Sequence, residues 1–485
     1  MLLPRDALEI DPRLTGDAYG MKVSRLIFAS LVTIDPYSLK PVPDLAESVE
    51  VINPRHYRGK LRKNLKLSGG SVLDATGVAA TFYSVLDPEI GSRYAGAYRR
   101  IERIETLDPL TIDFYIDGPH ATFLTDLELP VLRSEDAQVP VGAPGGPEPV
   151  GAGPYRLVAR KPGVMELRAN PKWHGGHPLF PAIRMLVVQD DNTRALRMVA
   201  GAGDLAFNAI PPLLIPLFPN RAGFQVKNAQ GIGTTYVGIN TQAGPLADVR
   251  VRRAVAHAID RRALVEAKFG GRARLARGWI PPGHWAYWGG TPYYEHNPDL
   301  ARALLDRAGL PAKGSAPRLE LALRTSSDRF RQSIAKAIAE MLRRVGIAVE
   351  IRPTEVALLL ADLNRGHFEL SLLQVPEVIE PHVLSWFFSS DRIPSRDRVE
   401  GANRWRFSNA ELDAELENGR RTPYLPLRRK AYRQVQRILA EQVPVIPLWH
   451  EDNVAVVSRR AGAFRVPVDG RFGTLARSPC YPTAP

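Results

Sequence analysis

A single cysteine, Cys480, stands close to the end of this 485-residue chain. One cysteine cannot form a disulfide within the chain, so no disulfide supports the fold, and cysteine use indicates no compartment. Long apolar runs are also missing, since none approaches the roughly 18 to 20 residues that span a bilayer. Residues 25–34 are apolar but too few, and they follow several acidic residues, unlike a signal peptide. We interpret them as the beginning of a core helix or strand.

Catalytic and metal-binding motifs are absent as well. The chain has no P-loop, no G-x-S-x-G and no H-E-x-x-H sequence. His174 and His177 offer two imidazoles in one turn, but no further ligand follows at metal-site spacing. We therefore expect no enzyme, no cofactor and no metal site, with a hydrolase kept only as a remote alternative.

The charge is positive but dispersed. Lys and Arg number 64 against 51 Asp and Glu, which gives a net charge of +13. A nucleic-acid module would gather these charges on one face beside aromatics or a known motif. Here the basic pairs are scattered, as solvated helix faces would be, so we expect no nucleic-acid partner. The overall field can still favour anionic ligands.

Strand and helix patterns alternate along the chain, which favours an α/β fold of two or three domains at this length. In residues 234–264 a strand-like run is followed by a Gly-Pro turn and then by an amphipathic helix. Residues 328–345 predict a second amphipathic helix, which ends at Gly346 between strands at 319–324 and 347–351. This order predicts a right-handed crossover in a mainly parallel sheet. Further strands are expected at 60–67, 110–116, 155–159, 164–169 and 183–188, and further helices at 75–86, 192–200 and 426–441.

The order of residues in several segments indicates a particular protein family. Asn240, residues 245–252 (PLADVRVR) and residues 258–261 (AIDR) resemble the central signature of the family 5 extracellular solute-binding proteins. Other blocks similar to that family follow in family order and cover nearly the whole chain: 41–50 (PVPDLAESVE), 151–155 (GAGPY), 170–173 (NPKW), 293–309 (YYEHNPDLARALLDRAG), 407–413 (FSNAELD) and 444–448 (PVIPL).

The resemblance implies a bilobed, periplasmic-binding-protein type II-like α/β fold with an extra small domain and a ligand cleft between the lobes. Residues 1–40 and 154–242 would form lobe 1, residues 243–453 lobe 2, and residues 454–485 would return to lobe 1. Residues 41–153 would form the extra α+β domain. The chain would cross between the lobes near Asn240 and near Asn453, and the lobes would close by hinge motion around the ligand.

The implied function is that of the substrate-binding component of an ABC importer. It would capture an oligopeptide, a dipeptide or a similar small polar solute and deliver it to permease subunits in the inner membrane. The protein would act as a monomer in the periplasm or elsewhere outside the cytoplasmic membrane. Two alternatives stay open: a cytoplasmic ligand sensor that reuses this fold, and a binder of a non-peptide ligand such as a metal complex.

The resemblance also implies candidate ligand contacts. Peptide binders of the family carry an Asp that pairs with the peptide ammonium, and Glu377 in residues 374–381 (QVPEVIEP) takes its place, although the neighbouring Trp and Tyr are lost. Tyr236 and Asn240 would present an aromatic wall and a hydrogen bond, or else serve the core. Trp386 would line a side-chain pocket or lie in the core. For a ligand carboxylate, the planar fork of an arginine is suited, and the candidates are Arg392, Arg396 and Arg404, unless they are surface residues.

Overall fold

The structure, a computed structural model, describes residues 1–141, 147–218, 223–395 and 401–477. Arg396 and Cys480 therefore lie outside the described residues. The chain divides into two compact units. Unit 1 consists of residues 1–229 and 453–485, and unit 2 consists of residues 230–452.

The described residues of unit 1 form four small sheets, of which one contains a parallel pair, β1 with β10, and the other three are antiparallel. Their strand orders are β1-β10-β9-β8, β11-β19-β12, β2-β3 and β4-β5-β7-β6. The strands of the first two are β1 (Leu2–Leu3), β8 (Tyr155–Lys161), β9 (Val164–Ala169), β10 (Ala182–Val187), β11 (Leu205–Phe207), β12 (Phe224–Ala229) and β19 (Asn453–Ser458). Those of the other two are β2 (Val32–Ile34), β3 (Pro41–Pro43), β4 (Ala46–Asn53), β5 (His56–Leu61), β6 (Ile101–Asp108) and β7 (Thr111–Ile116).

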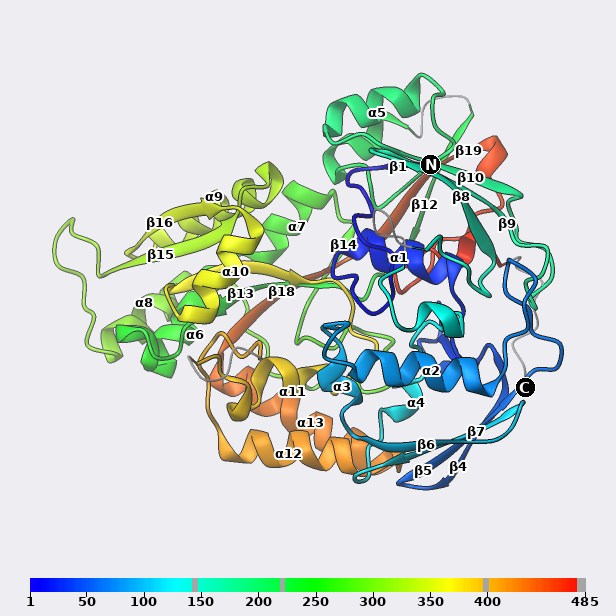
Figure 1. Ribbon diagram of the computed structural model, residues 1–485. Helices are drawn as coiled ribbons and strands as arrows, with labels where there is room; N and C mark the ends of the chain where they lie inside the picture. Colours follow the sequence, from blue (N-terminus) through cyan, green and yellow to red (C-terminus); the bar gives the residue numbers. More distant parts are fainter. Residues whose placement is uncertain (142–146, 219–222, 396–400, 478–485) are drawn as a thin grey trace. The chain divides into compact units, whose positions relative to one another are not determined.

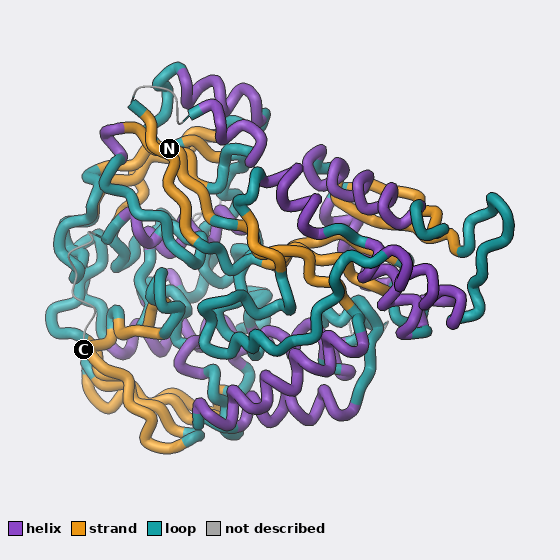
Figure 2. The backbone as a smooth tube through the Cα atoms, turned by 180° about the vertical axis from the view of Figure 1, so that it is seen from behind, coloured by secondary structure: helices purple, strands orange, loops and turns teal. Residues whose placement is uncertain are grey.

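The helices of unit 1 are mostly short. They are α1 (Ala18–Ile27), α2 (Ala75–Leu86), α3 (Ala95–Tyr98), α4 (Phe123–Asp126) and α5 (Asp191–Val199), with the 3-10 turns η1 (Ser134–Asp136), η2 (Pro212–Leu217), η5 (Arg459–Ala461) and η6 (Gly473–Leu475). Helix α2 lies along the β4–β7 sheet (Figure 1), whose four strands run side by side (Figure 2). One hydrophobic cluster joins this sheet to α2 and spans residues 29–152. That residues 41–153 form a domain of their own stays a prediction.

Unit 2 is built on one six-stranded sheet of order β14-β18-β13-β17-β15-β16. Its strands are β13 (Thr234–Ile239), β14 (Ala273–Leu275), β15 (Leu319–Ser326), β16 (Ile347–Thr354), β17 (Leu370–Val375) and β18 (Val445–Glu451). Strand β15 runs parallel to β16 and β17, whereas β13 is antiparallel to both β17 and β18. Every residue of β13, which pairs with β17 along one edge and with β18 along the other, is buried.

Helices and aromatic side chains cover this sheet. The helices are α6 (Val249–Ala258), α7 (Arg261–Phe269), α8 (Pro298–Arg307), α9 (Arg329–Arg343), α10 (Val356–Arg365), α11 (Val383–Phe388), α12 (Ala410–Arg421) and α13 (Leu425–Gln442), with the turns η3 (Gly244–Ala247) and η4 (Ser390–Arg392). Asp248, Asp260 and Asp328 accept backbone hydrogen bonds in the first turns of α6, α7 and α9, which is why these helices begin where they do.

The predicted crossover between parallel strands is confirmed, but the sheet is not mainly parallel as predicted, because β13 is antiparallel to β17 and β18, and β14 is antiparallel to β18. That the crossover is right-handed stays a prediction. Strands β15 and β16 pair in parallel, with α9 between them in sequence and packed on them (Figure 1). Gly346 has φ 89°, the left-handed conformation expected of a residue that ends a helix. The strand expected at 60–67 is instead β5, because Asn64 adopts φ 58° and breaks the strand after Leu61. Leu65 and Leu67 are nevertheless buried, so the apolar alternation that prompted the prediction is real.

The division between the units falls at residues 229–230 and 452–453. The first point lies ahead of the crossing expected near Asn240, because β13 is fully integrated in the sheet of unit 2. No helix within the described part of the chain is long and apolar enough to cross a membrane.

Candidate functional site

All the described candidate contacts belong to unit 2, so the site can be built within this unit. Glu377 follows β17 by two residues and is half-buried. The residues that follow it are held in place, since Val378 is fully buried and the carbonyl of Ile379 lies 2.8 Å from His284 Nε2. Three residues after Glu377, Glu380 accepts a hydrogen bond from the buried Arg428. The fold therefore fixes where Glu377 leaves the sheet.

Tyr236 belongs to an aromatic cluster beneath β13. Its side chain is 2% exposed, and its ring centroid lies 5.3 Å from that of Trp405 and 4.8 Å from that of Trp279. Burial raises the pKa of the Tyr236 hydroxyl, and the positive charge of Arg404 acts in the opposite direction. The structure thus places Tyr236 in the core, close enough to Arg404 for the charge of Arg404 to act on its pKa.

Arg404 is the candidate cation with the most distinctive environment. It is half-buried, and its Nε donates to Asn364 Oδ1 at 2.8 Å. Burial lowers its pKa, while Tyr236 acts to raise it. No carboxylate among the described residues forms an ion pair with Arg404, so its charge is desolvated and lacks a counter-ion within that part of the chain.

Trp386 and Arg392, which lie close to Arg404 in the sequence, form a second group. The Arg392 guanidinium carbon lies 5.4 Å from the centroid of Trp386, a cation–π distance, and 42% of Trp386 is exposed. Arg392 also lies 3.5 Å from the carboxylate of Asp391. Trp386 is therefore a surface aromatic and not a core residue, and its exposed ring is free to contact a ligand.

Asn240 is committed to local structure. Its Nδ2 donates to the carbonyls of Gly366 at 3.1 Å and Phe368 at 3.0 Å, and its Oδ1 accepts from the backbone N–H of Gln242 at 3.1 Å. These bonds fix the chain where β13 ends. A ligand would have to compete with three satisfied contacts, so the structure gives Asn240 a supporting position.

One residue that the sequence reasoning missed links these groups. Asn403 is fully buried, and its Nδ2 donates to the carbonyls of Phe388, Ser389 and Phe407. The backbone N–H of Asn403 also donates to the carbonyl of Arg392 at 3.1 Å. Asn403 therefore ties the segment that carries Arg404 to the segment that carries Arg392. No sequence pattern predicts this role, because it depends on hydrogen bonds between residues that only the folded loop brings together.

Metal ligation has no geometric support in the described part of the chain, where no group of three or more His, Cys, Asp and Glu side chains could hold an ion. His174, one of the two histidines considered above as metal ligands, instead has its Nε2 3.0 Å from Asp44 Oδ1. Unit 2 thus contains a half-buried cation, a half-buried carboxylate and an exposed aromatic ring. These groups suit non-covalent recognition of a small ligand with both charges.

The chain is similar to known proteins over most of its length. The family model of the bacterial extracellular solute-binding proteins, family 5 Middle, matches residues 40–393. A probable di/tripeptide-binding protein 5 of Pseudomonas aeruginosa is 28% identical over 473 residues, which cover 91% of this chain and 88% of that protein. The glutathione-binding protein GsiB of Salmonella paratyphi A is 26% identical over 475 residues, covering 96% of this chain and 91% of that protein.

Solved structures share the fold. NikA from Brucella suis in complex with Fe(III)-EDTA has a TM-score of 0.88 at 23% identity, over 99% of this chain and 100% of that one. The periplasmic binding protein DppA from Helicobacter pylori, in complex with the peptide STSA, has a TM-score of 0.82 at 21% identity, over 98% of this chain and 96% of that one. The fold is therefore the type II periplasmic-binding-protein fold that the sequence led us to expect.

Proposed function

The chain belongs to the bacterial extracellular solute-binding proteins of family 5, and we propose that it captures a short peptide or peptide-like zwitterion for the permease of an ABC importer. The names of two relatives, a di/tripeptide-binding and a glutathione-binding protein, support this ligand class. Capture is reversible and involves no covalent step. The chain passes between its units at two points, and a hinge motion there forms part of the proposal.

The observation that carries the proposal is the environment of Arg404. A desolvated charge that lacks a counter-ion costs several kcal/mol in a protein interior, and an opposite charge at hydrogen-bonding distance offsets this cost. Asn364 occupies the Nε of Arg404 and is neutral. The carboxylate of a ligand would supply the missing negative charge, because a guanidinium binds a carboxylate through two parallel hydrogen bonds.

Glu377 supplies the opposite charge for the ligand ammonium. Leu373 is paired with Tyr236 across the β13–β17 ladder, and Tyr236 adjoins Arg404. Glu377 follows Leu373 by four residues, so the Cα atoms of Leu373 and Glu377 are at most about 14 Å apart. Glu377 and Arg404 are thus attached to neighbouring parts of unit 2. We propose a short peptide as ligand, with the exposed ring of Trp386 contacting one of its side chains.

The location of the protein and its partner proteins are part of the same proposal. The family is extracellular by its description, and we place this chain outside the cytoplasmic membrane as a monomer that meets the permease subunits. Delivery to a permease requires that binding be reversible, so a dissociation constant in the micromolar range, about −8 kcal/mol, fits the task.

The test compares end groups of the ligand with side chains of the protein. Isothermal titration calorimetry would measure the binding of trialanine, N-acetyl-trialanine and trialanine amide. Glu377→Gln should weaken trialanine by at least tenfold, about 1.4 kcal/mol, and should leave the weaker N-acetyl-trialanine unaffected. Arg404→Gln should weaken trialanine by a similar factor and leave trialanine amide unaffected.

Arg343→Gln is the matched control, because 69% of the Arg343 side chain is exposed on α9 and its ion pair among the described residues is with Glu340. It should bind trialanine as the parent does. If Glu377→Gln weakens the acetylated and the free peptide equally, Glu377 acts on the fold and not on the ammonium. If no peptide binds the parent protein, while native mass spectrometry releases a different small molecule, the peptide proposal is wrong.

A further inference from the structure

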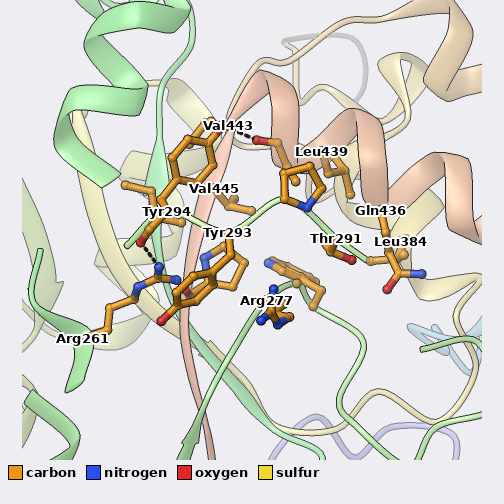
Figure 3. Close-up of a pocket in the computed structure, with 16 residues that line it drawn as sticks. Arg261, Arg277, Thr291, Tyr293, Tyr294, Leu384, Gln436, Leu439, Val443 and Val445 are labelled. Atoms are coloured by element: carbon orange, nitrogen blue, oxygen red, sulfur yellow. Dashed lines mark hydrogen bonds between the residues drawn. The ribbon is translucent and has the colours of Figure 1, made fainter. Parts of the chain in front are cut away.

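Unit 2 contains a cavity of about 30 Å³ that shares no residue with the candidate contacts above. It lies between the loop of residues 276–294 and α13, with Leu384 of α11 and strand β18 on its other sides (Figure 3). Room for one water molecule needs roughly 10 to 15 Å³, so the cavity is large enough for two waters or for an end group of a few atoms. Most side chains that line it are apolar, among them Leu439, Val443 and Val445.

Two arginines and a tyrosine form one wall of this cavity. The Arg261 guanidinium carbon lies 4.1 Å from the ring centroid of Tyr293, and that of Arg277 lies 5.1 Å from the same centroid. Figure 3 shows the three side chains side by side. The two guanidinium groups are close enough that the charge of Arg277 disfavours that of Arg261. Two positive charges this close together beside a cavity attract an anion.

Neither arginine has a carboxylate partner in the part of the chain that is described. Arg261 is 4% exposed and donates to the carbonyls of Ala276, Pro447 and Tyr294, which are neutral groups. Arg277 is exposed at the rim. The local charge is therefore +2, and only neutral dipoles and solvent balance it.

Trp279, which also lines the cavity, has a buried donor that lacks an acceptor among the described residues. Trp279 is 3% exposed, and its indole N–H has no hydrogen-bond partner in the described part of the molecule. An unpaired buried donor is costly, so a hydrogen-bond acceptor in the adjoining cavity would be stabilising. The Trp279 ring itself is fixed by Tyr236, Phe387 and Phe388, whose centroids each lie 4.8 Å away.

We propose that this cavity binds a small monocarboxylate of the size of acetate or propionate. One carboxylate oxygen accepts from the Trp279 indole N–H, the charge faces Arg277 and Arg261, and the short alkyl group lies against Leu439 and Val445. An apolar lining with one cationic wall selects a carboxylate over inorganic phosphate, which has no apolar part to bury. The site is distinct from the proposed peptide site and does not rest on it.

Sodium propionate is the probe. Selective ¹⁵N labelling of tryptophan gives one indole N–H resonance for each tryptophan, and Trp279→Phe identifies that of Trp279 while keeping an aromatic ring in place. Titration should shift the Trp279 resonance saturably, with a dissociation constant on the order of millimolar for a ligand of so few atoms. Arg277→Gln should raise that constant at least tenfold, because its side chain is exposed and the change leaves the core intact.

Four comparisons decide the outcome. The exposed control Arg343→Gln should leave the propionate constant unchanged, and so should Arg404→Gln, which separates this cavity from the peptide site. Trialanine should not shift the Trp279 resonance as propionate does; if it does, the carboxylate of a peptide, and not a free acid, is the ligand. Inorganic phosphate should bind more weakly than propionate. A Trp279 resonance that stays in place well above millimolar propionate, or a shift that Arg277→Gln does not weaken, overturns the proposal and leaves the cavity to ordered water.

Discussion

His284 is held as a neutral imidazole, and its protonation should destabilise unit 2 as the pH falls. The side chain is 5% exposed. Its Nδ1 accepts from the backbone N–H of Ala286 at 3.0 Å, so Nε2 carries the proton and donates to the carbonyl of Ile379 at 2.8 Å. A second proton would have to sit on Nδ1, which faces a donor. Burial lowers the pKa of His284 from 6.5 to about 4; the bond to Ile379 opposes this shift, and the charge of Arg428 adds to it.

The size of the effect follows from linkage. An unfolded chain takes up the proton near pH 6.5 and the folded chain only near pH 4. The contribution of His284 to stability is therefore complete above pH 6.5 and is lost as the pH falls toward 4. Between about pH 7.5 and about pH 5 the expected loss is about 2 kcal/mol. Because pH 5 lies above the folded pKa, this figure depends on the unfolded value and hardly on the folded one.

The assay is denaturant unfolding at the two pH values, for the parent and for His284→Asn. Asparagine keeps an acceptor near Ala286 and cannot be protonated, so the variant is less stable at both pH values but loses less on acidification. The change in unfolding free energy between the two pH values should be about 2 kcal/mol smaller in the variant than in the parent. Trialanine binding at the lower pH gives a second readout, since Ile379 lies between Glu377 and Glu380.

The same pH dependence in the parent and in His284→Asn would refute this reasoning. A direct check is available by nuclear magnetic resonance, in which the His284 ring should stay neutral until close to pH 4. His450, also fully buried, has its pKa lowered to about 3 by burial and by Arg274. It should add a similar loss in the parent and in the variant, so the difference between the two isolates His284.

Two stability predictions concern the packing of each unit. Gly238→Ala should destabilise unit 2 by about 1 to 3 kcal/mol in urea unfolding, because the new methyl would lie 2.1 Å from the ring of the buried Trp405. Gly289→Ala, with no atom closer than 3.7 Å, is its control, and equal losses in the two variants would contradict the packing argument. Asp11→Ala should destabilise unit 1 by roughly 3 to 5 kcal/mol, since it leaves Arg13 fully buried without its carboxylate. Thermal unfolding of the variant close to that of the parent would show that Arg13 finds another partner.

Much of the secondary structure could be predicted because local patterns decide it. Helix α2 and strand β9 have the bounds that were expected from residues 75–86 and 164–169. The apolar face of α6, with Val251, Ala254 and Val255, is buried as its spacing required. Strand β5 was misplaced because alternation continues through a residue whose backbone leaves the strand, and alternation alone does not report φ.

The site was only partly predictable. Residue type and family resemblance were enough to select Arg404, Trp386 and Glu377 as candidates. They were not enough to rank these candidates by how well their surroundings suit ligand binding. The sequence does not show that Arg404 lacks a carboxylate partner in the described chain, or that Trp386 is exposed, since both depend on which segments meet. The cavity beside Trp279 was missed, although the density of aromatic residues at 279–294 was a visible signal.

The sequence by itself determined the family, the α/β class and most helix and strand positions, because these follow from local patterns and from motifs in a fixed order. The tertiary structure decided where the chain divides, which arginines are desolvated, Arg404 and Arg261 among them, and which tryptophans of the described chain keep an unpaired N–H. These properties depend on contacts between residues far apart in the chain, such as Trp279 with Phe387 and Arg404 with Tyr236. Local sequence carries no record of such contacts, and burial and electrostatics are set by them.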